Sequence, residues 1–214
     1  MTDQESSYEI GKYPPVNHND FILSRASAIQ SYANVEQSLC GLFAGLLEIK
    51  DDLAGIVFYR VANARFRNRI LEELLEKRVG NANSIFWNSL ESFLRRLDQR
   101  RNEIVHWHIV QNIDLSKLHP EAANWSLRPP AGWMNGSPAS LNEKEMIEFI
   151  QQCEFISRLI NMFSMIMIRE VLPPAERQPW LEIFRQPILY PPPEGHPLSP
   201  NPKAPLSPPQ PSGE

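Results

Sequence analysis

Arg101, Asn102 and His106 lie within six residues of one another, in the run Arg101-Asn102-Glu103-Ile104-Val105-His106. A fixed cation, an amide and an imidazole are the groups that cleavage of a phosphodiester without a metal ion requires. The guanidinium neutralises charge on the phosphate oxygens, and an imidazole with its ordinary pKa of about 6.5 exchanges protons at neutral pH. This run is the best candidate in the chain for a catalytic site.

The run ends a helical pattern that we predict over residues 84–109. At about 100° per residue, one apolar stripe forms from Phe86, Leu90, Phe93, Leu97 and Ile104. Arg101 and His108 fall at the edge of this stripe, whereas Asn102 and His106 project from the other side. Arg101 and His106 therefore diverge on a regular helix. A kinked helix end, or a twofold axis beside the helix, would bring them to one cleft.

Structural roles also account for these residues taken singly. An arginine at the edge of a helix stripe can bury its stem and keep its charge in water, and a histidine in a late helical turn complements the helix dipole. Both interpretations stay open from the residues alone.

Arg101, Asn102 and His106 resemble the signature of the HEPN superfamily of small α-helical domains, in which Arg, a polar residue that is often Asn, a few variable residues and His follow one another. The resemblance covers roughly residues 19–170. One subgroup, a toxin paired with a nucleotidyltransferase, has a Tyr two residues after the His. This chain has His108 there, which departs from the subgroup's pattern.

The resemblance implies a metal-independent endoribonuclease of toxin or defence type, without a cofactor, in which the ribose 2′-hydroxyl attacks the adjacent phosphate. His106 would act as general acid or base, Arg101 would hold the phosphate, and Asn102 would orient the histidine or the sugar phosphate. RNA, a second copy of the chain and an antitoxin or other regulatory protein are the partners this implies. The alternative is a catalytically inactive dimeric HEPN-like module that binds a nucleotide, RNA or protein.

Charge is distributed unevenly along the chain, which carries 21 basic and 25 acidic residues. Residues 60–101 contain ten basic and five acidic side chains, so this segment is positively charged, although the whole chain has a net charge of −4. We predict that it contacts a polyanion, with Tyr59 and Phe66 available for stacking. The candidate substrate-binding residues are Arg65, Arg69, Arg96, Arg100 and His108. Ordinary i, i+4 helix pairs, such as Arg69 with Glu73, are the structural alternative.

The fold class that we predict is all-α: an antiparallel, HEPN-like bundle of four long helices, with a long loop before the last helix and a Pro-rich C-terminal tail. The expected helices span about residues 20–49, 51–78, 84–109 and 140–170. The last would begin at a capping box formed by Ser140 and Glu143. Between the last two helices, residues 114–139 are expected to be an irregular loop. Trp125, Trp133 and Met134 are expected to pack this loop over the bundle.

Three regions follow from composition: a flexible N-terminal segment (1–18), the helical domain (19–170) and a tail (171–214). Fourteen of the 20 prolines lie between Pro173 and Pro211. We expect a short docked piece near Trp180 and a passive, irregular or disordered chain from about Tyr190. No zinc-type ligand spacing, glycine-rich phosphate loop, signal peptide or membrane span is evident, so a cytoplasmic protein is expected.

The fourth predicted helix is apolar almost all round between Phe155 and Ile168. Such a helix must be central to a bundle or buried against another subunit. We therefore expect a homodimer, with the helix that carries Arg101 near the twofold axis.

Overall fold

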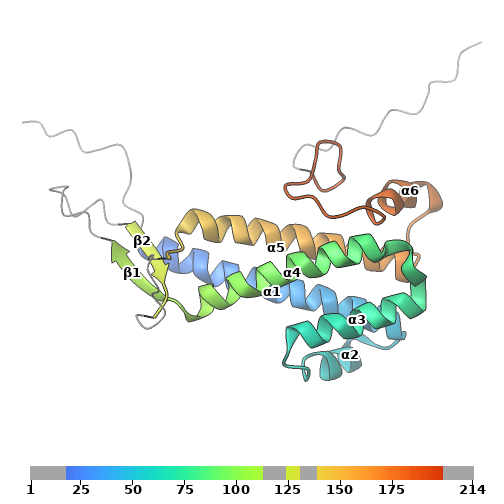
Figure 1. The fold of residues 1–214 in the computed structure, drawn as a ribbon, viewed down its shortest axis with the longest axis horizontal. Helices are drawn as coiled ribbons and strands as arrows, with labels where there is room; N and C mark the ends of the chain where they lie inside the picture. The colour runs from blue at the N-terminus through green and yellow to red at the C-terminus, as the bar shows by residue number, and fades with distance from the viewer. Residues whose placement is uncertain (1–17, 113–123, 131–138, 200–214) are drawn as a thin grey trace, which may run out of the picture.

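The computed structural model describes residues 18–112, 124–130 and 139–199. The elements, in chain order, are α1 (His18–Leu47), α2 (Asp51–Phe58), α3 (Ala64–Val79), the 3-10 turn η1 (Gly80–Asn83), α4 (Ser84–His106), β1 (His108–Asn112), β2 (Asn124–Arg128), α5 (Glu143–Phe163), the π-helical turn η4 (Ser164–Ile168) and α6 (Pro174–Ile183). The described chain is mainly helical and has one two-stranded hairpin (Figure 1).

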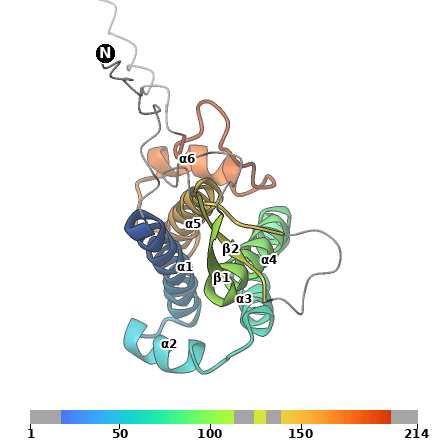
Figure 2. The same cartoon turned by 90° about the vertical axis from the view of Figure 1, so that its left-hand side faces the viewer.

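The helices α1, α4 and α5 form the body of the molecule, and α3 lies against its lower side (Figures 1 and 2). Ser24 near the start of α1 donates a hydrogen bond to Glu143 at the start of α5. Arg169, just after η4, reaches the carbonyl of Gly41 near the end of α1. The helices α1 and α5 therefore run in the same direction, and α4 runs opposite to them. The helical fold class is confirmed, but four long helices in antiparallel order are not what the described residues form.

The predicted second helix is in fact two helices. The helix α2 ends at Phe58, and α3 begins after Asn63, whose side-chain oxygen accepts a hydrogen bond from the backbone N–H of Phe66 at 3.2 Å. Asparagine is among the best N-cap residues because its side chain satisfies a helix N–H that has no partner within the helix. The prediction of one helix over 51–78 overlooked this internal cap.

The predicted third helix is correct at its start and too long at its end. The helix α4 stops at His106, and Trp107 is extended. His108 begins β1, which pairs with β2 in antiparallel register, His108 opposite Arg128. The β-branched pair Ile109 and Val110 favours a strand over a further helical turn. The interpretation of His108 as the edge of a helix stripe is therefore wrong.

The predicted irregular loop before the last helix contains the strand β2. Leu127 and Leu141 are fully buried and exchange backbone hydrogen bonds of 2.8 and 2.9 Å. Trp125 packs against the core, as predicted, whereas Trp133 and Met134 lie outside the described residues. Because Leu141 is extended, the capping box of α5 falls two residues later than predicted, at Asn142 and Glu145.

The tail is docked on the bundle as far as the structure describes it. Trp180 and Phe184 are buried, which confirms the short docked piece. Beyond it, however, Tyr190 lies against Phe93 and Phe155, with ring centroids 6.0 and 5.5 Å away. The expectation of a passive chain from Tyr190 is therefore wrong for residues 190–199.

The docked C-terminal segment covers apolar surface of α5, the helix that we expected a second subunit to bury. The side of α5 at Phe155 is covered by Tyr190 and His196, and the side at Phe163 by Phe184. The C-terminal segment of the same chain thus buries surface that we assigned to a second subunit. The burial of α5 requires no dimer.

His196 makes the docking of this segment sensitive to pH. Its Nδ1 accepts the backbone N–H of Leu198 at 3.0 Å, and its ring contacts Phe155 and Trp180. Burial lowers the pKa of His196 from its ordinary value of 6.5. A lowered pKa means that the folded state favours the neutral ring. The stability that the docked neutral ring contributes is present above pH 6.5 and is lost as the pH falls through the pKa of the folded state.

We expect the free energy of unfolding to fall between about pH 7.5 and pH 5, and the His196→Gln variant to show a flatter dependence. Denaturant titrations at several pH values measure both slopes. Equal slopes for wild type and His196→Gln would contradict the expectation.

None of the helices in the described part of the chain has both the length and the apolar character that crossing a membrane requires.

Candidate functional site

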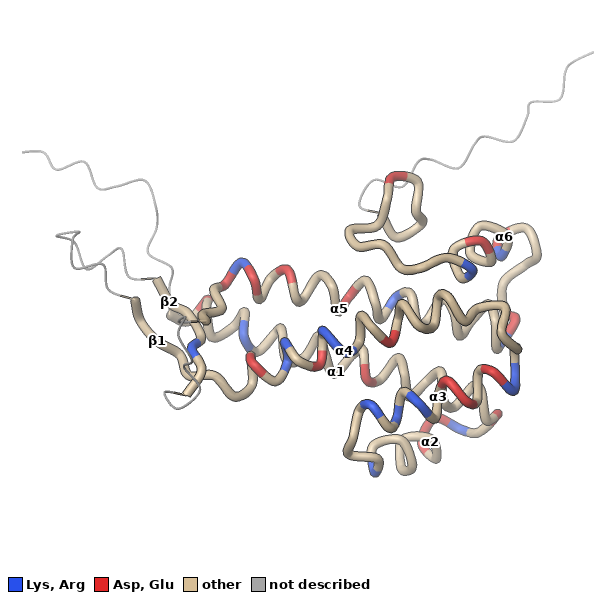
Figure 3. Tube along the Cα trace, in the orientation of Figure 1, with Lys and Arg blue, Asp and Glu red and all other residues tan. Residues whose placement is uncertain are grey.

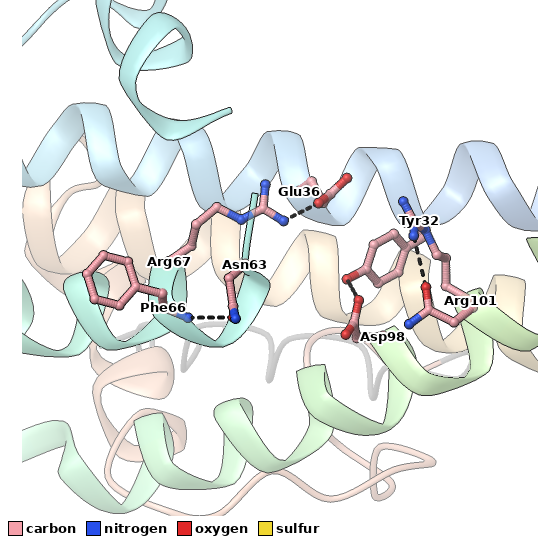
Figure 4. A network of polar contacts seen from close by, with 8 residues as sticks. Tyr32, Glu36, Asn63, Phe66, Arg67, Asp98 and Arg101 are labelled. Carbon is pink, nitrogen blue, oxygen red and sulfur yellow. Dashed lines mark hydrogen bonds and ion pairs between the residues drawn. The ribbon is translucent and has the colours of Figure 1, made fainter. Parts of the chain in front are cut away.

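The candidate run occupies the last turns of α4, on the side that faces α1. Arg101 is half-buried, whereas Asn102 and His106 are exposed. One Nη of Arg101 donates to the side-chain oxygen of Asn102 at 2.9 Å, and the guanidinium carbon lies 5.5 Å from the centroid of the Tyr32 ring (Figure 4). The predicted position at the edge of the apolar stripe is thus correct. The arginine rests its guanidinium on an aromatic ring of α1.

Asn102 links Arg101 to the helix face from which His106 projects. Residues four apart share a helix face, so Asn102 and His106 project together. The hydrogen bond links the guanidinium of Arg101 to Asn102, while the same guanidinium also lies over the Tyr32 ring. On the helix, Arg101 and His106 remain about 140° apart, so Asn102 is the residue that connects the cation to the face from which the imidazole projects.

The aromatic ring of Tyr32 lies beneath the guanidinium of Arg101. Its hydroxyl donates to a carboxylate oxygen of Asp98 at 3.0 Å. Burial raises the pKa of the Tyr32 phenol well above its ordinary range, and the neighbouring carboxylates Asp98 and Glu36 raise it further. The positive charge of Arg101 acts in the opposite direction. The phenol therefore stays protonated and serves as a donor to Asp98 and as a neutral surface for Arg101.

Arg25 on α1 holds the end of α4, and the sequence analysis missed it. Its guanidinium donates to the backbone carbonyls of Ile104 and Val105 at 2.8 Å each, and to that of Trp107 at 3.2 Å. The last carbonyls of a helix have no partner within the helix and carry its negative end, so a cation satisfies them well. Arg25 thereby fixes the backbone on either side of His106.

The remaining predicted basic residues do not join this group. Arg96 and Arg100 lie on the other flank of α4, where they line a groove of about 350 Å³ against α5 that also contains Glu103, Glu145 and Phe149. Arg100 is paired with Glu103 at 2.9 Å. This groove carries both signs of charge, so it offers no concentrated field to a polyanion.

Arg65 and Arg69 are exposed on α3, together with Phe66, which is 57% exposed. Arg69 lies 3.4 Å from Glu73, as the ordinary helix pairing predicts. Arg67 instead turns inward, pairs with Glu36 and lies over the Phe58 ring (Figure 4). The sequence from residue 53 to residue 71 contains no acid, and Figure 3 shows the basic residues at the start of α3. This tip is the cationic surface next to the candidate site.

His108 is exposed on β1, beyond the end of α4, and is displaced from the face shared by Asn102 and His106. Among the described residues, no group of three or more His, Cys, Asp or Glu side chains is placed to hold a metal ion.

The arrangement around Arg101 offers one cation for an anionic oxygen and one exposed imidazole for proton transfer, from a helix end that α1 fixes in place. Comparison of the chain with family models, with curated proteins and with solved structures finds no match.

Proposed function

We propose that the protein is a metal-independent endoribonuclease of toxin or defence type, similar to HEPN ribonucleases, that acts in the cytoplasm as a homodimer. The observation that supports the proposal is the guanidinium of Arg101, which lies over Tyr32 and is hydrogen-bonded to Asn102, one helical turn before the exposed His106. The resemblance of the Arg101 to His106 run to the family signature supports the same conclusion.

The chemistry is transfer of the phosphoryl group within RNA. The ribose 2′-hydroxyl attacks the adjacent phosphorus, the bond to the 5′-oxygen of the next nucleotide breaks, and a 2′,3′-cyclic phosphate forms. One imidazole removes the 2′-hydroxyl proton or protonates the leaving oxygen, and His106 is the residue with that capacity. Arg101 neutralises the charge that develops on the phosphorane oxygens.

A paired site explains how both proton transfers are catalysed. A single His106 serves as base or as acid, whereas two copies from a dimer supply one of each. The exposed Arg65 and Arg69 on α3 would hold phosphates that lead away from the scissile bond, with sequence-independent contacts. Phe66 beside them offers a ring face to an unpaired base.

The second candidate function is a binding module without catalysis, for a nucleotide, RNA or an antitoxin-like protein. The observation in its favour is that the guanidinium of Arg101 has two partners within its own chain, Asn102 and Tyr32. In that case Arg101 fastens α4 to α1, and His106 complements the helix dipole.

Incubation of the purified protein with mixed RNA in EDTA tests the proposal. We expect cleavage that persists in EDTA and leaves 2′,3′-cyclic phosphate ends. An oligonucleotide with a single 2′-deoxy sugar at the cleaved position should stay intact there, because the attacking hydroxyl is missing. Wild-type protein that leaves RNA intact, or that needs a divalent ion to cut it, would favour the binding module or a different chemistry.

A further inference from the structure

The short helix α2 has two apolar sides, and one of them faces water. Phe58 on the inner side is buried against α1, where its ring lies 5.7 Å from that of Phe43. Leu53, Ile56 and Val57 lie within about 100° of one another on the outer side. They are 52%, 62% and 52% exposed. A helix that faces water normally presents polar side chains there. We call these three residues the α2 face.

Cations lie at both ends of the α2 face. Lys50 precedes the helix, and Arg60 follows Leu53 by seven residues, which places it on the same side of the helix two turns later. The backbone N–H of Arg60 donates to the carbonyl of Val57 at 3.2 Å, so the chain still turns at this position. Both cations are exposed, and neither forms an ion pair with another described residue. Their charges are therefore available to an anion outside the chain.

The segment that contains the α2 face is positively charged. Residues 53–71 include four arginines and no acid, although the whole chain has a net charge of −4. Two acids precede the segment. Asp51 lies 3.6 Å from Arg169, and Asp52 accepts the backbone N–H of Leu53 at 2.8 Å. Figure 3 shows the basic residues of α2 and of the start of α3 at one corner of the molecule. Apolar and cationic side chains thus face outward together.

We propose that the α2 face binds the surface of an anionic membrane, with α2 in the headgroup region and Leu53, Ile56 and Val57 at the acyl boundary. Aliphatic side chains gain free energy when they leave water for this boundary, and cations beside them gain from the negative lipid headgroups. The contact is peripheral, because α2 has 8 residues and is about 12 Å long. It is reversible, because three aliphatic side chains bury little surface.

The same face suits RNA or a protein partner less well. Aliphatic side chains offer RNA neither a charge for its phosphates nor a ring on which a base can stack. A stable protein complex buries about 800 Å² on each partner, and two helical turns with three apolar side chains provide a small part of that area. A lipid surface requires no matching shape and accepts a helix that protrudes. In both views, α2 lies at the margin of the molecule (Figures 1 and 2).

Flotation of the full-length protein with large vesicles tests the α2 face. Vesicles of two parts phosphatidylcholine and one part phosphatidylserine should carry the wild-type protein at about 0.1 M salt, and about 1 M salt should release it. Vesicles of phosphatidylcholine alone should not carry it. Ile56→Glu should lower the partition coefficient about ten-fold or more, because an anion replaces an aliphatic side chain at the acyl boundary. The matched control is Ile85→Glu, at a 58% exposed position at the start of α4, which should bind like wild type.

A second pair of variants tests the cations. Arg60→Gln should lower the partition coefficient about five-fold, the usual contribution of one cation near an anionic surface. Its side chain is exposed in a turn, so the circular dichroism spectrum should not change. Arg95→Gln, at an exposed arginine of α4, gives the same net charge and should bind nearly as well as wild type.

Wild-type protein that floats with neither kind of vesicle, or equally with both, would overturn the membrane site. Unchanged flotation of Ile56→Glu, with binding that a short RNA abolishes, would show a phosphate-binding surface only and would also overturn it. So would a wild-type dimer that Ile56→Glu converts to a monomer in sedimentation equilibrium, because a second copy would then cover the face. RNA cleavage by Ile56→Glu should equal that of wild type, so membrane binding and ribonuclease activity can fail separately.

Discussion

Replacement of His106 by alanine is expected to lower the rate of RNA cleavage by about two to four powers of ten, the usual contribution of a positioned general acid or base. The fold should be unchanged, because the side chain is exposed and lies in the last turn of α4. Arg101→Ala should cause a loss of the same order through the developing phosphorane charge. Arg101→Lys should recover little, because lysine keeps the charge but lacks the planar fork that binds two oxygens.

His108→Ala is the matched control for His106→Ala. Both side chains are exposed histidines two residues apart, but His108 lies on β1, beyond the helix face shared by Asn102 and His106. Initial rates on a fluorescent RNA in EDTA should be within a few-fold of wild type for His108→Ala. Equal losses at both positions would show that general damage to the helix end, and not proton transfer, accounts for the effect. Full activity of His106→Ala would end the catalytic assignment.

The parts of the fold that the sequence predicted well are those governed by local periodicity. The apolar stripe of α4 around Leu97 is buried as expected, and α1 begins and ends within two residues of its prediction. Arg101 at the edge of this stripe is half-buried, and Asn102 and His106 on the other side are exposed, as a helical wheel predicts. The contact between Arg101 and Asn102 was not predicted, because a wheel gives the direction of Cα–Cβ bonds and not the reach of a long side chain.

The parts that were missed depend on contacts between distant segments. Arg25 donates a hydrogen bond to the backbone carbonyl of Ile104, 79 residues away in the sequence, and no local pattern predicts such a bond. A signal was nevertheless present, since Arg25 lies on the same face of α1 as Phe21 and Tyr32, both buried. Arg25 is a charged residue within the apolar stripe of α1, as Arg101 is at the edge of the stripe of α4. A charge in such a position indicates a polar partner in the fold.

The tail was misjudged for a different reason. Proline prevents regular helix and strand ladders, and its density after Val171 predicts an irregular or disordered chain. Proline does not prevent packing, however. A chain that has few conformations when unfolded loses little entropy on docking, so a few aromatic contacts suffice to hold it. Phe184 supplies three of these contacts, with the rings of Phe86, Phe163 and Trp180.

Replacement of Phe184 by alanine is therefore expected to lower the free energy of unfolding by about 3–5 kcal/mol, the range for deleting a buried phenylalanine. Phe184 is fully buried, and its ring lies between those of Phe86, Phe163 and Trp180, with centroids 5.1, 5.0 and 5.8 Å away. Removing it would leave a cavity lined by three aromatic rings at the junction of α4, α5 and α6. Urea titration followed by tryptophan fluorescence measures the loss.

Leu189→Ala, five residues further on, is the control, because Leu189 is 60% exposed and an exposed position away from special contacts changes stability by about 0.5 kcal/mol or less. If the two variants unfold at the same urea concentration, the segment after α5 does not dock on the bundle. The apolar surface of α5 near Phe155 and Phe163 would then need another cover, and a second subunit on α5 would again be required. A large loss at Phe184 together with a negligible one at Leu189 would show that the segment after α5 covers this apolar surface within the same chain.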